Sequence, residues 1–310
     1  MKILLIGKPG GITHWLEDAA AAFRAENHTV RVGAVRRSWL DARVEAALVE
    51  PLADALAKAA RRFAPDLILA IGGFHAPTPY LRRLAGLPGR PPLAGWVGDL
   101  FDEDAREAAA LYDVVAYTDS GLLARHPGLG FSSRSMFLPH AANLAAAPPT
   151  ARVRSPRMVF VANATPGRRA VIEALTSPVS VYGPGWKRAP PHEIHPGRTP
   201  HAAVARLYAG RLAALNIRNE RNVLFGLNQR SFAPCLSATP LVTDDQGDLQ
   251  RCFEPGSETL VWRDVAELNA VYERLRRSPE EARRVGEAGR RRVLAEHGYG
   301  HRLAALMAAL

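Results

Sequence analysis

The chain has 310 residues, of which 47% are hydrophobic and 23% charged, a balance that is typical of globular proteins and excludes a disordered chain. The net charge of +10 falls almost wholly on residues 151–310, which carry +9 against +1 for residues 1–150. Such a basic half suits an anionic ligand such as a diphosphate, and equally a solvated arginine-rich surface. The length allows two domains of ordinary size.

Several protein classes are excluded by what the chain lacks. Its two cysteines, Cys235 and Cys252, are too few for a disulfide framework or a cysteine zinc site. The amino terminus reads as a first strand, and no apolar run approaches the ~20 residues that cross a bilayer, so we expect a soluble cytoplasmic protein. The basic residues lack interleaved aromatic residues, so nucleic acid is not an expected partner. A basic patch still allows peripheral contact with an anionic membrane, and the oligomeric state stays open.

The first half alternates strands and helices. An apolar run at residues 3–6 enters a glycine-rich turn at residues 7–11 and then an amphipathic helix, the opening of a Rossmann-like domain. Further strands are predicted at the ranges 29–35, 67–71, 93–97 and 112–117.

Three polar residues follow these predicted strands closely. His14 lies beyond the first turn, His75 follows strand 67–71, and Asp99 follows strand 93–97. Ligands of open α/β sheets bind beyond the carboxyl ends of strands, so each is a candidate for taking a proton from an acceptor hydroxyl. The alternatives are ordinary loop or helix-capping histidines. For the acidic residues, we assign chemistry to Asp99 and helix capping to Asp102.

The second half begins after a proline-rich stretch at residues 146–149, where we place a domain boundary following residue 147. A strand at 159–162 precedes Asn163 and Arg169, and a guanidinium there suits phosphate oxygens, whereas Arg168 is interpreted as a surface residue. A strand at 179–182 leads into a turn that is expected to flank a nucleobase and that contains Gly183, Gly185 and Trp186.

Histidines in the following segment do not indicate a metal. His192, His195 and His201 lie in a proline-broken stretch, residues 190–201, which is expected to be irregular. No carboxylate pattern accompanies them, so no metal site is predicted.

The most informative stretch is residues 215–248, which reads as strand, loop, helix and strand. The first strand ends at Asn216 and Arg218, Arg230 and Ser231 open the expected helix after Asn228, and the last strand runs into Asp244 and Asp245. A helix N-terminus beside strand ends favours an anion. The predicted anion is the diphosphate of a nucleotide sugar.

The same stretch resembles a known family. The residues Gly226, Asn228, Arg230, Phe232, Asp244, Phe253 and Gly256 match the pattern of CgeB-like glycosyltransferases. The resemblance implies an α/β fold of GT-B architecture, in which two facing Rossmann-like domains are followed by a terminal helix that crosses back to the first. The implied domains are residues 1–147 and 148–296, and the crossing helix is 297–310. Two departures are Ala233 in place of a ribose-binding glutamate, and Ser237-Ala238 in place of Cys-Gly.

The resemblance implies a metal-independent glycosyltransferase. It would use a nucleotide-diphosphate sugar as co-substrate, no cofactor, and an unknown acceptor that is a glycan, a lipid-linked molecule, a protein or a small molecule. The expected catalytic residues are Asp99, His75 and His14. The expected donor-binding residues are Asn163, Arg169, Gly183, Gly185, Trp186, Asn216, Arg218, Asn228, Arg230, Ser231, Asp244 and Asp245. The alternatives are a nucleotide-sugar epimerase and a non-catalytic nucleotide or sugar binder, the second of which is favoured by Ala233.

Overall fold

The computed structural model describes residues 1–8, 14–35, 42–128, 130, 132–150, 155–220 and 222–310, and it divides the chain into two compact units. Most of the predicted turn at residues 7–11 lies outside the described residues. Unit 1 comprises Met1–Pro139 and Tyr299–Leu310, and unit 2 comprises His140–Gly298. The sequence predicts domain boundaries after residues 147 and 296. The segment that follows Pro139 lies in unit 2 because Ala142 forms a β-bridge with Gly298 and packs in the unit 2 core.

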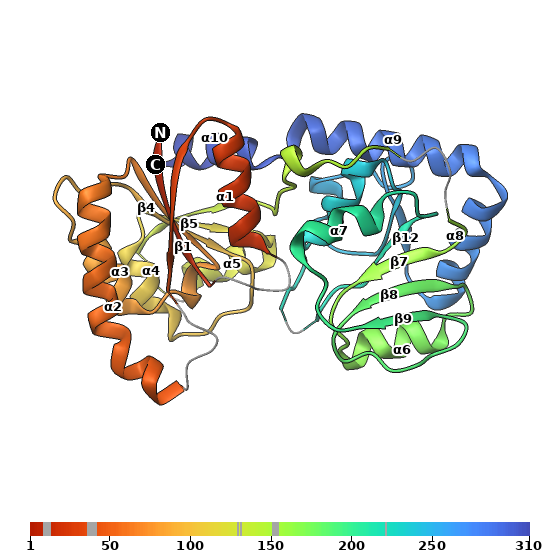
Figure 1. The fold of residues 1–310 in the computed structure, drawn as a ribbon, viewed down its shortest axis with the longest axis horizontal. Coiled ribbons are helices and arrows are strands. Elements are labelled where there is room, and N and C mark those ends of the chain that lie inside the picture. The colour runs from red at the N-terminus through yellow and green to blue at the C-terminus, as the bar shows by residue number, and fades with distance from the viewer. Residues whose placement is uncertain (9–13, 36–41, 129, 131, 151–154, 221) are drawn as a thin grey trace. The chain divides into compact units, whose positions relative to one another are not determined.

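Unit 1 is a Rossmann-like domain built on a parallel sheet of order β2-β1-β3-β4-β5-β6 (Figure 1). Its strands are apolar throughout where the sheet is covered on both faces, as in β3 and β4. Its elements are β1 (Lys2–Gly7), α1 (Trp15–Ala25), β2 (Thr29–Ala34), α2 (Ala42–Phe63), β3 (Leu67–Ile71), η1 (Gly73–His75), α3 (Thr78–Ala85), β4 (Leu93–Val97), α4 (Ala105–Leu111), β5 (Val114–Tyr117), α5 (Ser120–Gly128), β6 (Arg134–Phe137) and α10 (Tyr299–Ala309).

The terminal helix α10 packs back on unit 1, as the resemblance implies. It lies beside α1, where the Tyr299 ring contacts Phe23 and Trp96 with centroids 6.0 Å away in each case. Arg302 Nε donates a hydrogen bond to the carbonyl of Pro139 at 2.7 Å. A buried aromatic contact and a satisfied carbonyl therefore hold the end of the chain on the first domain.

Unit 2 is a second parallel sheet, of order β12-β11-β10-β7-β8-β9 (Figure 1). Its core joins the inner faces of β7 and β8 to α6, α8 and α9. Its elements are η2 (Leu144–Ala146), β7 (Met158–Val161), α6 (Pro166–Ala174), β8 (Val179–Gly183), β9 (Glu193–Pro196), α7 (His201–Tyr208), β10 (Ala214–Asn216), η3 (Gln229–Ser231), η4 (Ala233–Ser237), β11 (Leu241–Asp244), η5 (Leu249–Arg251), β12 (Leu260–Trp262), α8 (Val265–Arg277) and α9 (Pro279–Glu296).

Two segments of unit 2 differ from the sequence prediction. The stretch expected to be irregular contains the edge strand β9, which pairs with β8 at Tyr182 and His195. Proline is tolerated there because the outer side of an edge strand needs no donors. The helix expected from Arg230 is two short 3-10 turns, η3 and η4. Pro234 has no N–H, and Ala238 leaves the helical region, so the segment cannot extend.

Ala238 carries backbone strain that can be measured. Its φ of 55° is left-handed, in the place where the resembled family has glycine. A left-handed conformation costs an L-residue about 1–2 kcal/mol. Glycine avoids this cost, but its unfolded chain has more conformational entropy, which offsets part of the gain in stability. We expect Ala238→Gly to raise the free energy of unfolding by about 0.5–1 kcal/mol in urea titrations. Ala288→Gly, inside α9, is the matched control and should lower it by about 1 kcal/mol. Equal losses in both variants would contradict a left-handed Ala238.

Candidate functional site

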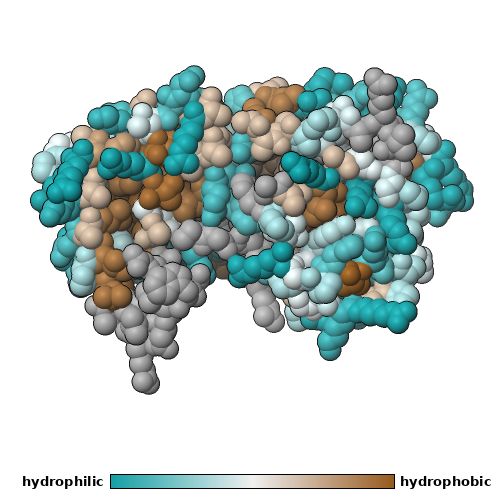
Figure 2. Space-filling model, in the orientation of Figure 1, coloured by the Kyte–Doolittle hydropathy of each residue, from teal (hydrophilic) through white to brown (hydrophobic). Residues whose placement is uncertain are grey.

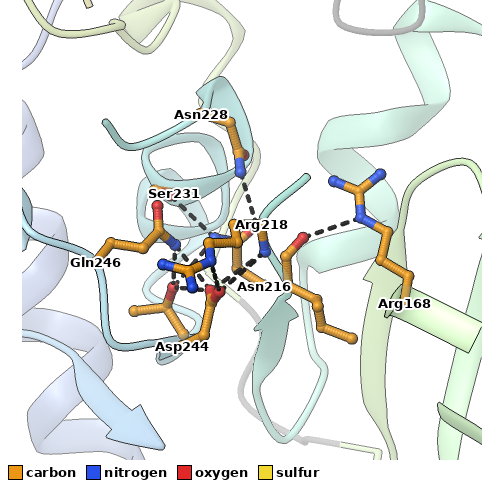
Figure 3. Close-up of polar contacts among 9 residues, drawn as sticks. Arg168, Asn216, Arg218, Asn228, Ser231, Asp244 and Gln246 are labelled. Carbon is orange, nitrogen blue, oxygen red and sulfur yellow. Dashed lines mark hydrogen bonds and ion pairs between the residues drawn. The ribbon is translucent and has the colours of Figure 1, made fainter. Parts of the chain in front are cut away.

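Polar side chains join the carboxyl ends of β10 and β11 to the turn η3 (Figure 3). Asn216, fully buried at the end of β10, donates from Nδ2 to Thr243 Oγ1 at 3.1 Å and to Ser231 Oγ at 3.4 Å. Asn216 Oδ1 accepts a hydrogen bond from Nδ2 of Asn228 at 3.1 Å. The structure thus brings the predicted residues Asn216, Asn228 and Ser231 together, and it adds Thr243, which sequence analysis does not single out.

The backbone amides of η3 are already occupied. Asn228 accepts from the N–H of Arg230 through its side chain at 2.9 Å and from the N–H of Ser231 through its carbonyl at 2.9 Å. These two N–H groups, which the sequence predicts to bind an anion, therefore form hydrogen bonds within the turn. An anion at this edge of the sheet therefore does not bind to these two N–H groups.

Asp244 anchors the same network from the end of β11 (Figure 3). Its carboxylate accepts from the backbone N–H of Arg218 at 3.2 Å and from Nε2 of Gln246 at 2.8 Å. Burial raises the pKa of Asp244, while these hydrogen bonds to the charged form act against that rise. Asp245 is not part of this network, because its carboxylate lies 3.5 Å from Nε of Arg263 on the exposed surface.

Two arginines bring positive charge to this edge of the sheet, Arg168 buried and Arg230 half-buried with a buried Nε. Arg168 on α6 is 4% exposed, and its Nε donates to the carbonyl of Ile217 at 3.0 Å (Figure 3). Its Nη1 donates to the carbonyl of Asn163 at 3.3 Å. Burial, together with the neighbouring charge of Arg230, lowers the pKa of Arg168 to about 9. Burial also lowers the pKa of Arg230, and Tyr208 and Asp244 oppose that shift. Sequence analysis is wrong in interpreting Arg168 as a surface residue.

Each of these guanidinium groups has a buried nitrogen without an acceptor in the described part of the chain. The atoms are Nη2 of Arg168 and Nε of Arg230. A buried donor normally finds an acceptor, and two neighbouring cations repel each other. Two such donors suit an external group that is negatively charged and rich in acceptor oxygens.

The loops after β7 and β8 pack tightly beside Arg168. Gly183 has a φ of 141°, and a Cβ on it would lie 2.2 Å from the carbonyl oxygen of Ala162. Gly185 is left-handed, with a φ of 84°, and its carbonyl accepts from Nη2 of Arg169 at 2.5 Å. Trp186 is 7% exposed and donates from Nε1 to Ala162 at 2.7 Å. Arg169 and Trp186 thus support the glycine turn through its backbone and the core.

The acidic and imidazole candidates of unit 1 come together at the ends of two adjacent strands. His75 ends η1 after β3, Asp99 follows β4, and Nε2 of His75 lies 3.0 Å from Oδ2 of Asp99. His14 is the left-handed cap residue before α1, with a φ of 50°. Asp102 Oδ1 accepts from the N–H of Asp104 at 3.1 Å, but Asp104 is the N-cap residue of α4 and no side chain caps the helix, so Asp102 is not the predicted helix cap.

Part of the basic excess of the second half lies elsewhere, on α8 and α9, which carry eight arginines against six glutamates. Figure 2 shows hydrophilic residues over the outer side of α8 and α9. Arg276 pairs there with Glu273 at 2.9 Å, and Arg283 pairs with Glu287 at 3.2 Å. Such exposed pairs stabilise the fold little. Of the two explanations for the charge, solvated surface accounts for the exposed arginines of these two helices, and an anion site is indicated where the buried Arg168 and the half-buried Arg230 lie.

The described residues contain neither a cluster of metal ligands nor a membrane-spanning helix. No group of three or more histidine, cysteine, aspartate or glutamate side chains in that part of the chain could hold a metal ion. None of the helices described is long and apolar enough to cross a bilayer.

A family model described as glycosyl transferase-like matches residues 163–308, the part that carries the strand-end network, Arg168 and Arg230. No curated protein sequence matches the chain. The match covers the region on which the resemblance to CgeB-like proteins is strongest, and the narrower CgeB-like assignment stays a hypothesis.

Solved structures share the whole fold. The Anabaena protein Alr3699/HepE in complex with UDP has a TM-score of 0.70 at 14% identity, with 100% of both chains covered. Sucrose-phosphate synthase from Thermosynechococcus elongatus has a TM-score of 0.69 at 14% identity, covering 99% of this chain and 97% of that one. The fold shared with these structures and the two parallel six-stranded sheets confirm the predicted GT-B architecture.

Proposed function

With glycosyltransferase confirmed as the enzyme class by the family match over residues 163–308 and the GT-B fold, we propose that the chain transfers a sugar from a nucleoside-diphosphate sugar bound by unit 2. The observation that carries the proposal is the pair of incompletely partnered guanidinium groups of Arg168, which is buried, and Arg230, whose Nε is buried. We also propose membership of the CgeB-like family, on the residues that match its pattern. The acceptor is a molecule with a nucleophilic hydroxyl, whether glycan, lipid-linked, protein or small molecule.

A diphosphate would supply the hydrogen-bond acceptors and the negative charge that the two arginines lack. It supplies negative charge between two like charges, and its oxygens accept hydrogen bonds from Arg168 Nη2 and Arg230 Nε. During transfer the bond between the anomeric carbon and the phosphate oxygen breaks, and its electron pair stays on the diphosphate. Cations placed beforehand in a water-poor site stabilise that developing charge.

The same charges make the proposed reaction independent of a metal ion. A divalent cation and a pair of arginines perform the same electrostatic task on a leaving diphosphate. We therefore expect transfer to continue at an unchanged rate in excess EDTA. A loss of activity in EDTA that Mg²⁺ restores would contradict this part of the proposal.

The base of the donor is best sought first among uridine nucleotides. HepE, which shares the fold, has been crystallised with UDP, with UDP and glucose, and with UDP-glucose. Ala233 lies in η4, partly buried against the cluster that includes Tyr208, and its methyl group offers no acceptor to a ribose hydroxyl. A nucleotide that lacks a ribose hydroxyl, such as dTDP, is therefore expected to bind as well as its ribose counterpart.

The test is titration calorimetry of the purified chain with UDP, GDP, CMP, dTDP and UDP-glucose in EDTA. We expect at least one of these ligands to bind, and it should stabilise the fold by about 2.7 kcal/mol at a hundred times its dissociation constant. Binding of none of them to the wild-type protein would overturn the donor proposal. Binding of a nucleotide sugar without nucleotide release favours the non-catalytic binder. Conversion of its sugar without an acceptor favours the epimerase.

A further inference from the structure

Unit 2 holds a cavity of about 980 Å³ at the edge of its sheet opposite to the strand-end network. Pro156, Leu212 and Ala238 line it, and they lie shortly before β7, β10 and β11. Because these strands are parallel, their amino ends meet at one edge of the sheet, while Asn216 and Asp244 lie at the other. The described residues that line the cavity all belong to unit 2. Small-molecule sites have volumes of about 300–1,000 Å³, so this cavity is large enough for a ligand.

Apolar side chains form part of the wall of this cavity. Leu212 and Leu275 are buried, whereas Leu294 on α9 is 40% exposed. Leu294 is among the few large hydrophobic side chains that are exposed in the described part of the chain. Covering such apolar surface favours binding by about 25 cal/mol for each Å² removed from water. The cavity therefore suits a ligand that has an apolar portion.

Arg290 brings a cation with an unsatisfied donor to the same cavity. The residue is half-buried, and its Nε is buried without a hydrogen-bond partner among the described residues. Arg276 and Arg283 also line the cavity, and each forms an ion pair with a glutamate, at 2.9 Å and 3.2 Å respectively. Solvation and ion pairing account for those two arginines, but not for the buried nitrogen of Arg290. A buried cationic donor normally has an acceptor, which an anion in the cavity would supply.

The carboxylates that line the cavity pair with Arg283 rather than with Arg290. Glu280 and Glu287 lie 4.0 Å and 3.2 Å from the guanidinium of Arg283, and among the described residues no ion pair joins either of them to Arg290. The exposed Arg291 adds a further positive charge next to Arg290. The described lining thus carries four arginines against two glutamates, and this surplus of positive charge favours an anionic ligand.

We propose that this cavity binds an amphiphilic anion, a small molecule in which one phosphate or carboxylate group is attached to an apolar chain. The oxygens of that group accept hydrogen bonds from Arg290, and the apolar chain covers Leu294 and the buried leucines of the wall. The site is separate from that of the nucleotide sugar, because Arg168 and Arg230 lie beyond the carboxyl ends of the strands. The inference goes beyond the proposed function and does not depend on it.

The test is titration calorimetry of the full chain with monomeric octyl phosphate, and with inorganic phosphate and octanol as its separate parts. We expect octyl phosphate to bind about tenfold more tightly than either part, or better, because it alone uses both Arg290 and Leu294. Arg290→Met should weaken its binding about 10- to 100-fold, the scale of one hydrogen bond to a charged group. Leu294→Ser should weaken the binding of octyl phosphate and leave that of inorganic phosphate unchanged.

Two further variants separate this site from the helix surface and from the donor site. Arg284→Met is the matched control, because Arg284 is exposed on the same helix and is not among the described residues that line the cavity. It should leave the dissociation constant of octyl phosphate unchanged, and so should Arg230→Met.

Equal binding of octyl phosphate to wild type and to Arg290→Met would overturn the inference. Loss of binding in Arg230→Met would also overturn it, since the phosphate would then occupy the donor site. Urea unfolding establishes that each variant is folded before it is titrated. Binding of UDP is measured separately, so its absence would count against the donor proposal and leave the cavity site standing.

Discussion

Replacing Arg230 by methionine is expected to lower turnover by two to three orders of magnitude and, at the same time, to stabilise the ligand-free protein. The guanidinium of Arg230 forms no hydrogen bond or ion pair with the described residues, its Nε is buried, and it lies near the charge of Arg168. Loss of one preorganised donor to a developing anion costs about 10²–10³ in rate. Removing a buried charge that is incompletely paired, at similar volume, raises stability by about 1–4 kcal/mol.

The two readouts are kcat with the donor and the free energy of unfolding in urea without it. A residue with a purely structural role would give the opposite stability change, so a loss of stability in Arg230→Met would remove Arg230 from the anion site. Arg263→Met is the matched control, because Arg263 is 67% exposed and pairs only with surface carboxylates. It should leave kcat unchanged and should change the free energy of unfolding by no more than about 0.5 kcal/mol.

Arg168→Met should separate the two arginines. It should weaken donor binding as Arg230→Met does, because both guanidinium groups face the same anion in our proposal. Its stability change should have the opposite sign, since Arg168 donates to the carbonyls of Ile217 and Asn163, and each buried acceptor left without a partner costs about 1–3 kcal/mol.

Gly286→Ala is expected to cost about 3 kcal/mol of unfolding free energy or more. A Cβ at this position would lie 1.9 Å from the carbonyl oxygen of Ala238 and 2.8 Å from its carbonyl carbon, so backbone rather than a flexible side chain must move. The neighbouring Gly289 is less crowded, with a Cβ 2.7 Å from the carbonyl oxygen of Glu258. Gly286 lets α9 approach the backbone that follows η4, and Gly289 lets it approach the backbone before β12.

The measurement is urea unfolding, with UDP titration as a second readout, because η4 continues from the turn that carries Arg230. Gly128→Ala is the matched control: Gly128 ends α5 with a helical backbone, and a Cβ there meets nothing within 4 Å. That change should be neutral or stabilise by up to about 1 kcal/mol. Similar results for both glycines would mean that α9 does not approach Ala238 so closely.

Arg168 was wrongly assigned to the surface because only its position at a helix start was considered. A cation near a helix start is ordinarily solvated, and sequence analysis chose Arg169 for the anion instead. The signal that places Arg168 was present, because it lies four residues before Ile172 and seven before Leu175, both of which are buried. Helical spacing puts these residues on one face, and that face covers the sheet.

Hydropathy and turn residues determined much of this protein without any tertiary information. Apolar runs bounded by glycine and proline predicted most of the strands, and because parallel strands point the same way, residues after them had to gather at one edge of each sheet. Asn216 and Asp244 were found for that reason, and so were His75 and Asp99 as separate candidates, whereas Asn228 was found from the expected helix start and the family resemblance.

Only the tertiary structure decided which of those residues meet. His75 and Asp99 are in contact because β3 lies beside β4, and Asn216 reaches Thr243 because β10 lies beside β11. Strand order follows from how crossover helices pack over the whole sheet, and local sequence does not encode it. Burial of Arg168 and Arg230 has the same origin, since the desolvation that lowers their pKa values is caused by the elements packed around them.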